Sequence, residues 1–247
     1  MQQKLKNRVA IVTGASRGIG RATCLALARE GVNIVATARD ASQLDGLASE
    51  CESLGVTTII TAADARDPDA VAALRERVLN RFSGVDILVN NAGVGKYGDL
   101  TDMEEADYDW MMDTNMKSTF LFSRIFVPDL IARGHGNLIV VSSQAGLHGY
   151  PGEAIYCATK HAQVGFATAL DGELRPHNVK VTLICPGGVR TTFAFGTGRD
   201  EETPALPDML EADDVAEAIV FACKQSDKAR MPVIELRPMN EKRYGGA

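Results

Sequence analysis

The 247-residue chain lacks the features that mark secreted, membrane-spanning and metal-binding proteins. Its five cysteines are odd in number and include no C-x-x-C pair, so we expect reduced thiols and a cytoplasmic protein. The longest apolar runs fall well short of the roughly 18 residues of a membrane span, and residues 9–12 are too few for a signal-peptide core. We therefore expect no membrane association. We also expect no metal, because the four histidines show no ligand spacing: His135, His148, His161 and His177.

An excess of positive charge is also missing. The chain has 26 basic and 32 acidic side chains, which gives a formal net charge of -6 at pH 7. Proteins that bind nucleic acid by neutralising phosphates usually carry a basic excess, so we expect no nucleic-acid partner. The hydrophobic content of 45% is sufficient to bury the core of one globular domain.

Short β-branched runs alternate with longer helical patterns along the whole chain. Most runs are continuously apolar, which is typical of parallel strands covered on both faces. A repeated strand-helix order predicts an α/β fold, namely a single doubly wound Rossmann-like domain over residues 1–247 with a seven-stranded parallel sheet. The predicted strands are 9–13, 33–37, 57–62, 87–90, 138–142, 179–184 and 233–236, and the predicted helices are 21–30, 42–54, 67–82, 104–131, 153–174 and 213–224.

A glycine-rich turn follows the first predicted strand and opens the first helix. Gly14, Gly18 and Gly20 allow close approach of a ligand to the backbone, and free N–H groups at a helix N-terminus attract phosphate. The turn therefore predicts a nucleotide-binding site, although three glycines could also serve only to tighten a β-α connection.

The end of the second strand indicates which nicotinamide cofactor is preferred. An acidic residue there would bind the adenosine ribose of NAD, but the position holds Ala38. Arg39 follows directly and Arg17 lies in the glycine turn, so two guanidinium groups favour the 2′-phosphate of NADP(H) over NAD(H). The alternative is that both arginines are solvated and that Asp40 contacts the ribose.

Tyr156 and Lys160 are four residues apart in a helical pattern and so lie on one face. A neighbouring ammonium favours the phenolate and would bring the tyrosine pKa toward neutrality, which suits acid-base chemistry. Ser143 follows the fifth strand and could hold a substrate oxygen, with Ser142 as the competing candidate.

Six motifs occur in one order: Thr-Gly-x-x-x-Gly-x-Gly at 13–20, Asn-Asn-Ala-Gly at 90–93, Asn115, Ser143, Tyr156-x-x-x-Lys160 and Pro186-Gly187. In this order the chain resembles the short-chain dehydrogenase/reductase family, single-domain type, and is similar to carbonyl and 3-oxoacyl-carrier-protein reductases. The resemblance implies an NADP-dependent oxidoreductase that transfers a hydride between the nicotinamide and a carbonyl or secondary alcohol.

The same resemblance implies roles for individual residues. Tyr156 would be the general acid/base, Lys160 would bind the nicotinamide ribose, and Asn115 would bend its helix and support a water-mediated proton relay. Asp64 would contact the adenine, unless it is a helix cap or a loop carboxylate. The implied catalytic residues are Asn115, Ser143, Tyr156 and Lys160, and the implied cofactor residues are Gly14, Ser16, Arg17, Gly18, Ile19, Gly20, Arg39, Asp64, Asn91, Ala92, Gly93, Tyr156, Lys160, Pro186, Gly187, Val189 and Thr191.

Residues 187–210 form a long stretch rich in Gly, Thr and Pro, which we interpret as a substrate lid. Phe193 within it could close over the substrate or simply pack beneath the loop. His148 and Tyr150 lie between the catalytic serine and tyrosine and are further candidates for substrate contact, or for exposure to solvent.

The C-terminal end departs from the family pattern. Many members end in Val-Asp-Gly-Gly, whereas here residues 233–238 lead to a charged end with Glu241, Lys242 and Arg243. The difference weakens the case for a role in fatty-acid synthesis and for the usual tetramer. Apolar surplus in the helices at 104–131 and 153–174 still predicts a homodimer or homotetramer. Two other functions remain open, an NADP(H)-binding redox-sensing regulator and a lyase or isomerase that uses the nicotinamide transiently.

Overall fold

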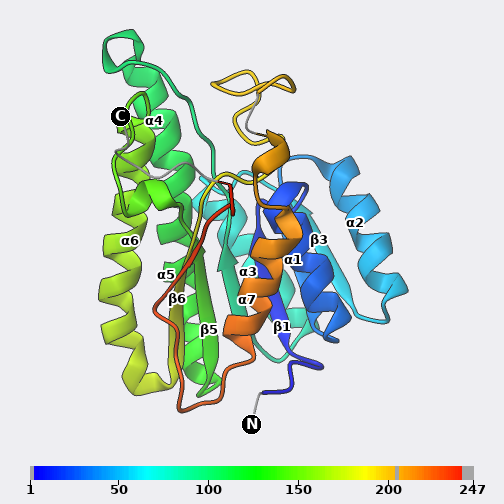
Figure 1. The fold of residues 1–247 in the computed structure, drawn as a ribbon. Helices are drawn as coiled ribbons and strands as arrows, with labels where there is room; N and C mark the ends of the chain where they lie inside the picture. The colour runs from blue at the N-terminus through cyan, green and yellow to red at the C-terminus, as the bar shows by residue number, and fades with distance from the viewer. Residues whose placement is uncertain (1–2, 204–205, 241–247) are drawn as a thin grey trace.

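The computed structural model describes residues 3–203 and 206–240 and contains one sheet of seven parallel strands. The strand order is β3-β2-β1-β4-β5-β6-β7, so the chain starts at the centre of the sheet and winds outward in both directions (Figure 1). The prediction of an α/β Rossmann-like fold is confirmed. The strands are β1 (Val9–Thr13), β2 (Asn33–Ala38), β3 (Thr58–Ala62), β4 (Ile87–Asn90), β5 (Gly136–Val141), β6 (Val179–Pro186) and β7 (Val233–Leu236).

Helices cover both faces of the sheet, as the apolar strands require. One core lies between the sheet and α1, α2 and α7, and the other lies between the sheet and α3, α5 and α6. In Figure 1, α1 and α7 lie in front of the sheet and α3 lies behind it. The helices are α1 (Gly18–Arg29), α2 (Ala41–Ser53), α3 (Pro68–Arg81), α4 (Glu105–Met112), α5 (Ser118–Ala132), α6 (Ala154–Leu174) and α7 (Ala212–Cys223).

The single helix predicted over residues 104–131 is in fact two helices joined by a π-helical turn, Asp113–Lys117. The interruption centres on Asn115, whose carbonyl oxygen accepts hydrogen bonds from the side chains of Thr119 (2.8 Å) and Gln163 (2.9 Å). Side-chain donors at a backbone carbonyl are a known cause of such a break in the helical ladder. Periodicity alone continues across the turn and therefore did not reveal it.

The connection after β6 has more order than a plain loop. β6 itself continues two residues past its predicted end, to Pro186, and pairs with β7. Beyond it, Val189 forms a bridge with Leu210, and Phe195 forms one with Arg199. Residues 204 and 205 of the predicted lid, and the charged residues Glu241, Lys242 and Arg243, lie outside the described residues.

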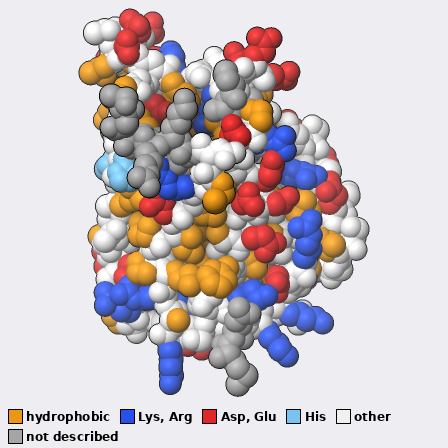
Figure 2. Space-filling view, viewed as in Figure 1, with side chains coloured by type: hydrophobic (Ala, Val, Ile, Leu, Met, Phe, Trp, Pro, Cys, Tyr) orange, Lys and Arg blue, Asp and Glu red, His pale blue; other side chains and the backbone are white. Residues whose placement is uncertain are grey.

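β7 lies at one edge of the sheet and is only partly covered. Figure 2 shows hydrophobic side chains gathered on this face over α7 and the neighbouring strand. Phe221 on α7 and Val233 on β7 are 48% and 47% exposed. Over the described part of the chain, no helix is both long and apolar enough to cross a membrane.

Candidate active site

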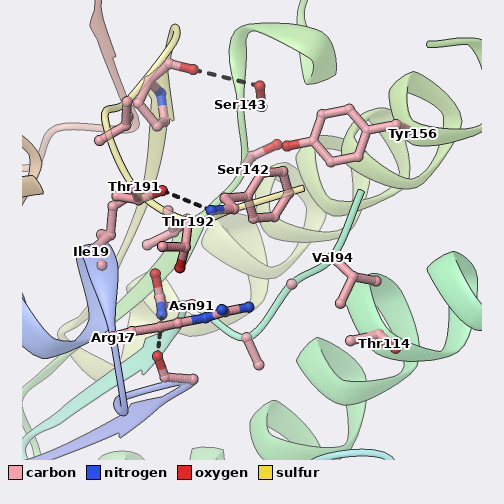
Figure 3. Close-up of a pocket in the computed structure, with 18 of the residues that line it drawn as sticks. Arg17, Ile19, Asn91, Val94, Thr114, Ser142, Ser143, Tyr156, Thr191 and Thr192 are labelled. Atoms are coloured by element: carbon pink, nitrogen blue, oxygen red, sulfur yellow. Dashed lines mark hydrogen bonds between the residues drawn. The ribbon is translucent and has the colours of Figure 1, made fainter. Parts of the chain in front are cut away.

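A cavity of about 900 Å³ lies along the carboxyl edge of the sheet. Open α/β sheets bind ligands at this edge, next to the first strand, where the strand order reverses. The glycine turn, Arg39, Asp64, Asn91, Ser143, Tyr156, Lys160 and Thr191 all line it. Figure 3 shows Arg17 and Ile19 at one end of this cavity, and Tyr156 and Ser143 at the other.

The glycine turn has the shape that a bound phosphate requires. Gly14 and Gly18 have φ of 64° and 53°, in the left-handed region that favours glycine. A Cβ at position 14 would lie 2.9 Å from the Cα of Ala92, and a Cβ at position 20 would overlap the Gly14 carbonyl oxygen. Asn91 fastens the turn from β4, since its Nδ2 donates to Thr13 O at 2.9 Å and Gly14 O at 3.2 Å. The turn thus leaves backbone and a helix N-terminus facing the cavity, which fits a nucleotide pyrophosphate.

Two arginines line the end of the cavity next to β2. Arg17 and Arg39 are both exposed, and neither forms an ion pair with any described residue. Asp40, the alternative ribose ligand, is instead the N-cap of α2. Its Oδ1 accepts from Gln43 N (3.1 Å) and Ser42 Oγ (2.8 Å), and its Oδ2 accepts from Gln43 Nε2 (2.7 Å). These hydrogen bonds lower the pKa of Asp40, which is exposed and also lines the cavity.

Asp64 lines the same end and is held by Arg66, a residue that sequence reasoning missed. Arg66 Nε lies 3.0 Å from both carboxylate oxygens, and its Nη2 lies 2.6 Å from Oδ2. The hydrogen bonds from Arg66 are the main reason that the pKa of Asp64 is lowered, and the charge of Arg39 acts in the same direction. The cap of α3 is Asp67, so Asp64 is not the helix cap.

Tyr156 is buried beside two aromatic rings at the other end of the cavity. Its side chain is 6% exposed, and the ring centroids of Tyr97 and Phe193 lie 5.7 and 5.9 Å from its own. Burial raises the pKa of the Tyr156 phenol well above its ordinary value, while a hydrogen bond with Ser143 acts in the opposite direction. Burial thus shifts the pKa away from neutrality, opposite to the direction expected from a neighbouring lysine.

The two candidate serines have different surroundings. Ser142 Oγ is buried and donates to the carbonyl oxygen of Lys160 at 3.1 Å, so its proton is used in a hydrogen bond with the backbone of α6. Ser143 is only half-buried, and its Oγ accepts from Ala145 N at 3.1 Å and pairs with the tyrosine phenol. The arrangement favours Ser143 as the serine that shares a substrate oxygen with Tyr156.

Lys160 is almost fully buried one helical turn after Tyr156. Its Nζ donates to Val141 O at 3.1 Å and to Gln163 Oε1 at 3.0 Å, and lies 5.7 Å from the Tyr156 ring centroid. Burial lowers the pKa of Lys160 to about 8, with the nearby Cys185 opposing the shift. The ammonium is therefore charged at neutral pH and close to its titration range.

Asn115 is held in place by both polar atoms of its side chain. Its Oδ1 accepts from Val94 N at 2.8 Å, and its Nδ2 donates to Val94 O and to Thr159 Oγ1, both at 2.9 Å. Thr159 Oγ1 in turn donates to the carbonyl oxygen of Tyr156. Asn115 thus fixes the segment that follows β4 against the helix that carries the tyrosine.

The remaining predicted residues are mostly brought to the cavity. Ser16, Ala92, Gly93, Pro186, Gly187, Val189, Tyr150 and Phe193 line it, whereas Gly20 lies beneath the turn. His148 is exposed and is not among the lining residues. Tyr97 and Arg199 also line the cavity, and no sequence motif marks them because both lie outside the regular helices and strands. The described residues contain no group of three or more His, Cys, Asp or Glu side chains placed to hold a metal ion.

The parallel sheet, the glycine turn and the cavity at its carboxyl edge define a dinucleotide-binding α/β protein. The family model "short chain dehydrogenase" matches residues 8–202. The chain belongs to this family of oxidoreductases, as the resemblance in its motifs indicated.

Curated relatives support the same conclusion. Sepiapterin reductase of Chlorobaculum tepidum is 33% identical over 237 residues, which cover 93% of this chain and 96% of that protein. The 3-oxoacyl-[acyl-carrier-protein] reductase of Thermotoga maritima is 33% identical over 223 residues, which cover 88% and 91%.

Two solved structures are also similar over nearly the full length. An alcohol dehydrogenase from the archaeon Thermococcus sibiricus, complexed with 5-hydroxy-NADP, has a TM-score of 0.89 and 29% identity and covers 96% of this chain and 99% of its own. Carveol dehydrogenase from Mycobacterium avium, in complex with NAD, shares the fold with a TM-score of 0.87 and 24% identity, covering 95% and 96%. Both similar structures hold a nicotinamide cofactor.

Proposed function

We propose that this protein is an NADP(H)-dependent oxidoreductase that interconverts a carbonyl compound and a secondary alcohol, with Tyr156 as the general acid/base. The observation that carries the proposal is that one cavity is lined by the glycine turn at one end and by Ser143, Tyr156 and Lys160 at the other. A bound dinucleotide that spans this cavity would bring its reactive ring next to the tyrosine phenol.

The residues of the chain have separable tasks. The nicotinamide supplies or accepts the hydride when it is bound. Tyr156 gives its proton to the substrate oxygen during reduction and takes one back during oxidation, while Ser143 orients that oxygen. Lys160 places a positive charge behind the phenol and offers an N–H to the nicotinamide ribose. Burial excludes water from the reacting atoms and keeps Tyr156 protonated until substrate arrives.

The choice of NADP(H) over NAD(H) rests on charge. Among the described residues, Arg17 and Arg39 form no ion pair, and the two nearby carboxylates, Asp40 and Asp64, accept hydrogen bonds from their own neighbours. The two free guanidinium groups at this end therefore favour a 2′-phosphate.

The substrate would be a small molecule that reaches the tyrosine between three aromatic side chains. Tyr97, Tyr150 and Phe193 line the cavity near the phenol, and Phe193 comes from the predicted lid. Thr197 attaches the predicted lid to the segment that follows β4, since its Oγ1 donates to Gly95 O at 2.7 Å and its carbonyl oxygen accepts from Tyr97 N. We place the protein in the cytoplasm, on its five unpaired buried cysteines.

The test is to follow NADPH absorbance against a panel of ketones, diketones, quinones, aldehydes and 3-oxoacyl thioesters, with NADH in parallel. We expect turnover with NADPH and a lower kcat/KM with NADH. Binding of NADPH without any turnover would instead favour the redox-sensing regulator. Conversion of substrate at constant cofactor redox state would favour the lyase or isomerase.

We also propose a homodimer or homotetramer. Exposed hydrophobic side chains lie on two separate faces, with Tyr108 and Phe120 on α4 and α5, and Phe221 and Val233 on α7 and β7. Light scattering after size-exclusion chromatography checks this, and a monomeric mass at micromolar concentration would contradict it.

A further inference from the structure

A cation from the predicted lid lies at the tyrosine end of the cavity. Among the described residues, the cations that line the cavity are Arg17, Arg39, Arg66, Lys160 and Arg199. The first three lie at the end next to β2, and Lys160 is almost fully buried behind the phenol. Arg199 is half-buried and comes from the predicted lid. Arg199 is therefore the cation placed to meet a substrate.

The lid carries Arg199 to the phenol by packing on Tyr97. The backbone N–H of Tyr97 donates to Thr197 O at 2.8 Å, and a Cβ at Gly198 would lie only 2.5 Å from Tyr97 Cδ2. Arg199 follows directly, and the Tyr97 ring centroid lies 5.7 Å from that of Tyr156. Burial raises the pKa of both phenols, and the charge of Arg199 opposes the shift in each. The charge of Arg199 therefore acts at the reacting end of the cavity.

Most N–H groups of Arg199 have no acceptor among the described residues. A guanidinium has five N–H donors. Only Nη1 of Arg199 donates within the part of the chain that the structure describes, to Val189 O at 3.5 Å. The neighbouring carboxylate of Asp200 accepts instead from Glu202 N at 3.1 Å and from Thr203 Oγ1 at 3.0 Å. The guanidinium thus keeps donors for a ligand in the cavity.

A carboxylate, Glu153, lines the same end of the cavity. Glu153 is half-buried and lies one turn before Tyr156, where α6 begins. Burial raises the pKa of Glu153, and the charge of Arg199 acts in the opposite direction. An anionic group would be attracted to Arg199 and repelled by Glu153, so the two charges together favour one orientation of a charged substrate.

We propose that Arg199 determines substrate specificity by binding a carboxylate, so that the substrate is an oxo acid in reduction and a hydroxy acid in oxidation. A planar guanidinium fits a carboxylate through two parallel hydrogen bonds. In reduction the carbonyl carbon accepts a hydride from NADPH, which is left as NADP⁺. The carbonyl oxygen accepts the proton of Tyr156, which is regained in net from solvent, and the carboxylate is unchanged. This inference rests on the proposed function and adds the substrate class to it.

The test compares ketones of similar size that differ in charge. 3-Oxobutanoate and 5-oxohexanoate carry a carboxylate at two distances from the carbonyl, their methyl esters are neutral, and (4-oxopentyl)trimethylammonium is a cation. With NADPH, we expect kcat/KM for the better acid to exceed that for its ester by about tenfold, the effect of one charge-assisted contact. The cation should be the poorest substrate.

Variants of the two charged residues assign the preference. Arg199→Gln should lower kcat/KM for the acid by about tenfold and change that for the ester less than about twofold. Arg199→Lys keeps the charge without the planar fork and should lose only about threefold. Glu153→Gln removes the repulsion and should raise kcat/KM for the acid by about twofold. The control is Arg190→Gln, since Arg190 is exposed, pairs with Glu211 and is not among the lining residues.

Binding is measured separately, by calorimetry on the complex with NADP⁺. Cofactor and oxo acid are then both oxidised, so no hydride can move. We expect the acid to bind more tightly than its ester, and Arg199→Gln to remove the difference. An absent acid preference, or one that Arg199→Gln leaves intact, would overturn the inference, while turnover of any ketone would still support the proposed function. Failure to turn over every carbonyl would count against the proposed function instead, and the calorimetric comparison would still decide the role of Arg199.

Discussion

The two ends of the cavity are built in different ways. The end next to β2 consists of charged side chains on exposed turns, and its ion pair, Asp64 with Arg66, joins residues only two positions apart. The tyrosine end consists of buried polar groups on separate elements, linked by hydrogen bonds over long sequence distances, such as Gln163 to Asn115. The arrangement of the end next to β2 therefore depends on neighbouring residues in the sequence, and that of the tyrosine end depends on packing between distant elements.

This difference predicts how each end responds to substitution. Charges at an exposed site act over several ångströms and are screened by salt, so we expect their loss to change cofactor affinity by modest factors. Buried hydrogen-bonded groups act as a unit, and the loss of one leaves its partners without hydrogen bonds in a low-dielectric setting. The following predictions run from the largest expected effect to the smallest.

Tyr156→Phe removes the proposed proton donor from the buried end and should lower kcat by about 10³-fold, within the range typical of general acid-base groups. The ring keeps its contacts with Tyr97 and Phe193, so NADPH binding should change little. Stopped-flow turnover and fluorescence titration measure the two quantities, and a variant that retains activity would contradict the role of the phenol.

Gly20→Ala places a methyl group against the Gly14 carbonyl oxygen and Asn91 Nδ2. The turn must shift, so we expect both NADPH and NADH to bind about 100-fold more weakly, with a lower Tm as for other overpacked sites. The control is Gly46→Ala on α2, where a Cβ meets no atom within 4 Å. That variant should be slightly more stable, by about 0.5–1 kcal/mol. Equal melting temperatures and NADPH affinities in Gly20→Ala and Gly46→Ala would contradict the close packing of the glycine turn.

The pH dependence of turnover should reflect the buried lysine. Burial lowers the pKa of Lys160 to about 8, so the ammonium loses its proton as the pH rises through this value. We expect kcat to be constant below this pKa and to fall by up to tenfold for each pH unit above it. A profile that stays flat to pH 10 would show that the charge of Lys160 is not needed.

Arg39→Ala acts at the exposed end and should weaken NADPH by about tenfold, the effect of losing one charge-assisted contact with a phosphate, while NADH changes less than twofold. Arg77→Ala, on α3 and outside the cavity lining, is a matched loss of one arginine and should leave both affinities unchanged. The ratio of the two Kd values decides the question, and a loss of the same size for NADH would contradict the assignment to the 2′-phosphate.

Arg66→Ala should have the smallest effect, about a threefold loss of NADPH affinity, as expected for a partly exposed pair. Without Arg66, the Asp64 carboxylate is free to attract Arg39, whose charge already acts on it. The double variant Asp64→Asn with Arg66→Ala removes this competition and should restore the affinity. A double variant that binds no better than Arg66→Ala would mean that Arg66 contacts the cofactor directly.

The same contrast explains how much the sequence could predict. The seven strands and the glycine turn follow from patterns within a few neighbouring residues, and the fold prediction was confirmed. The family resemblance implied a bend at Asn115, but periodicity could not predict it, because one of the two side chains that bind the Asn115 carbonyl oxygen belongs to Gln163, some 48 residues away. For a similar reason, spacing revealed the lysine next to Tyr156 but not the depth of burial, which raises the pKa of the phenol.

The glycine at position 20 and the arginine at position 39 also differ in how freely they can evolve. At position 20 even a methyl group would overlap the Gly14 carbonyl oxygen, so descendants of this chain must keep glycine there or rebuild the turn. Arg39 follows the end of β2 and is exposed at the cavity, so its replacement removes no buried side chain. A lineage with this architecture can change its cofactor by single substitutions at the surface while the framework that holds the dinucleotide is inherited unchanged.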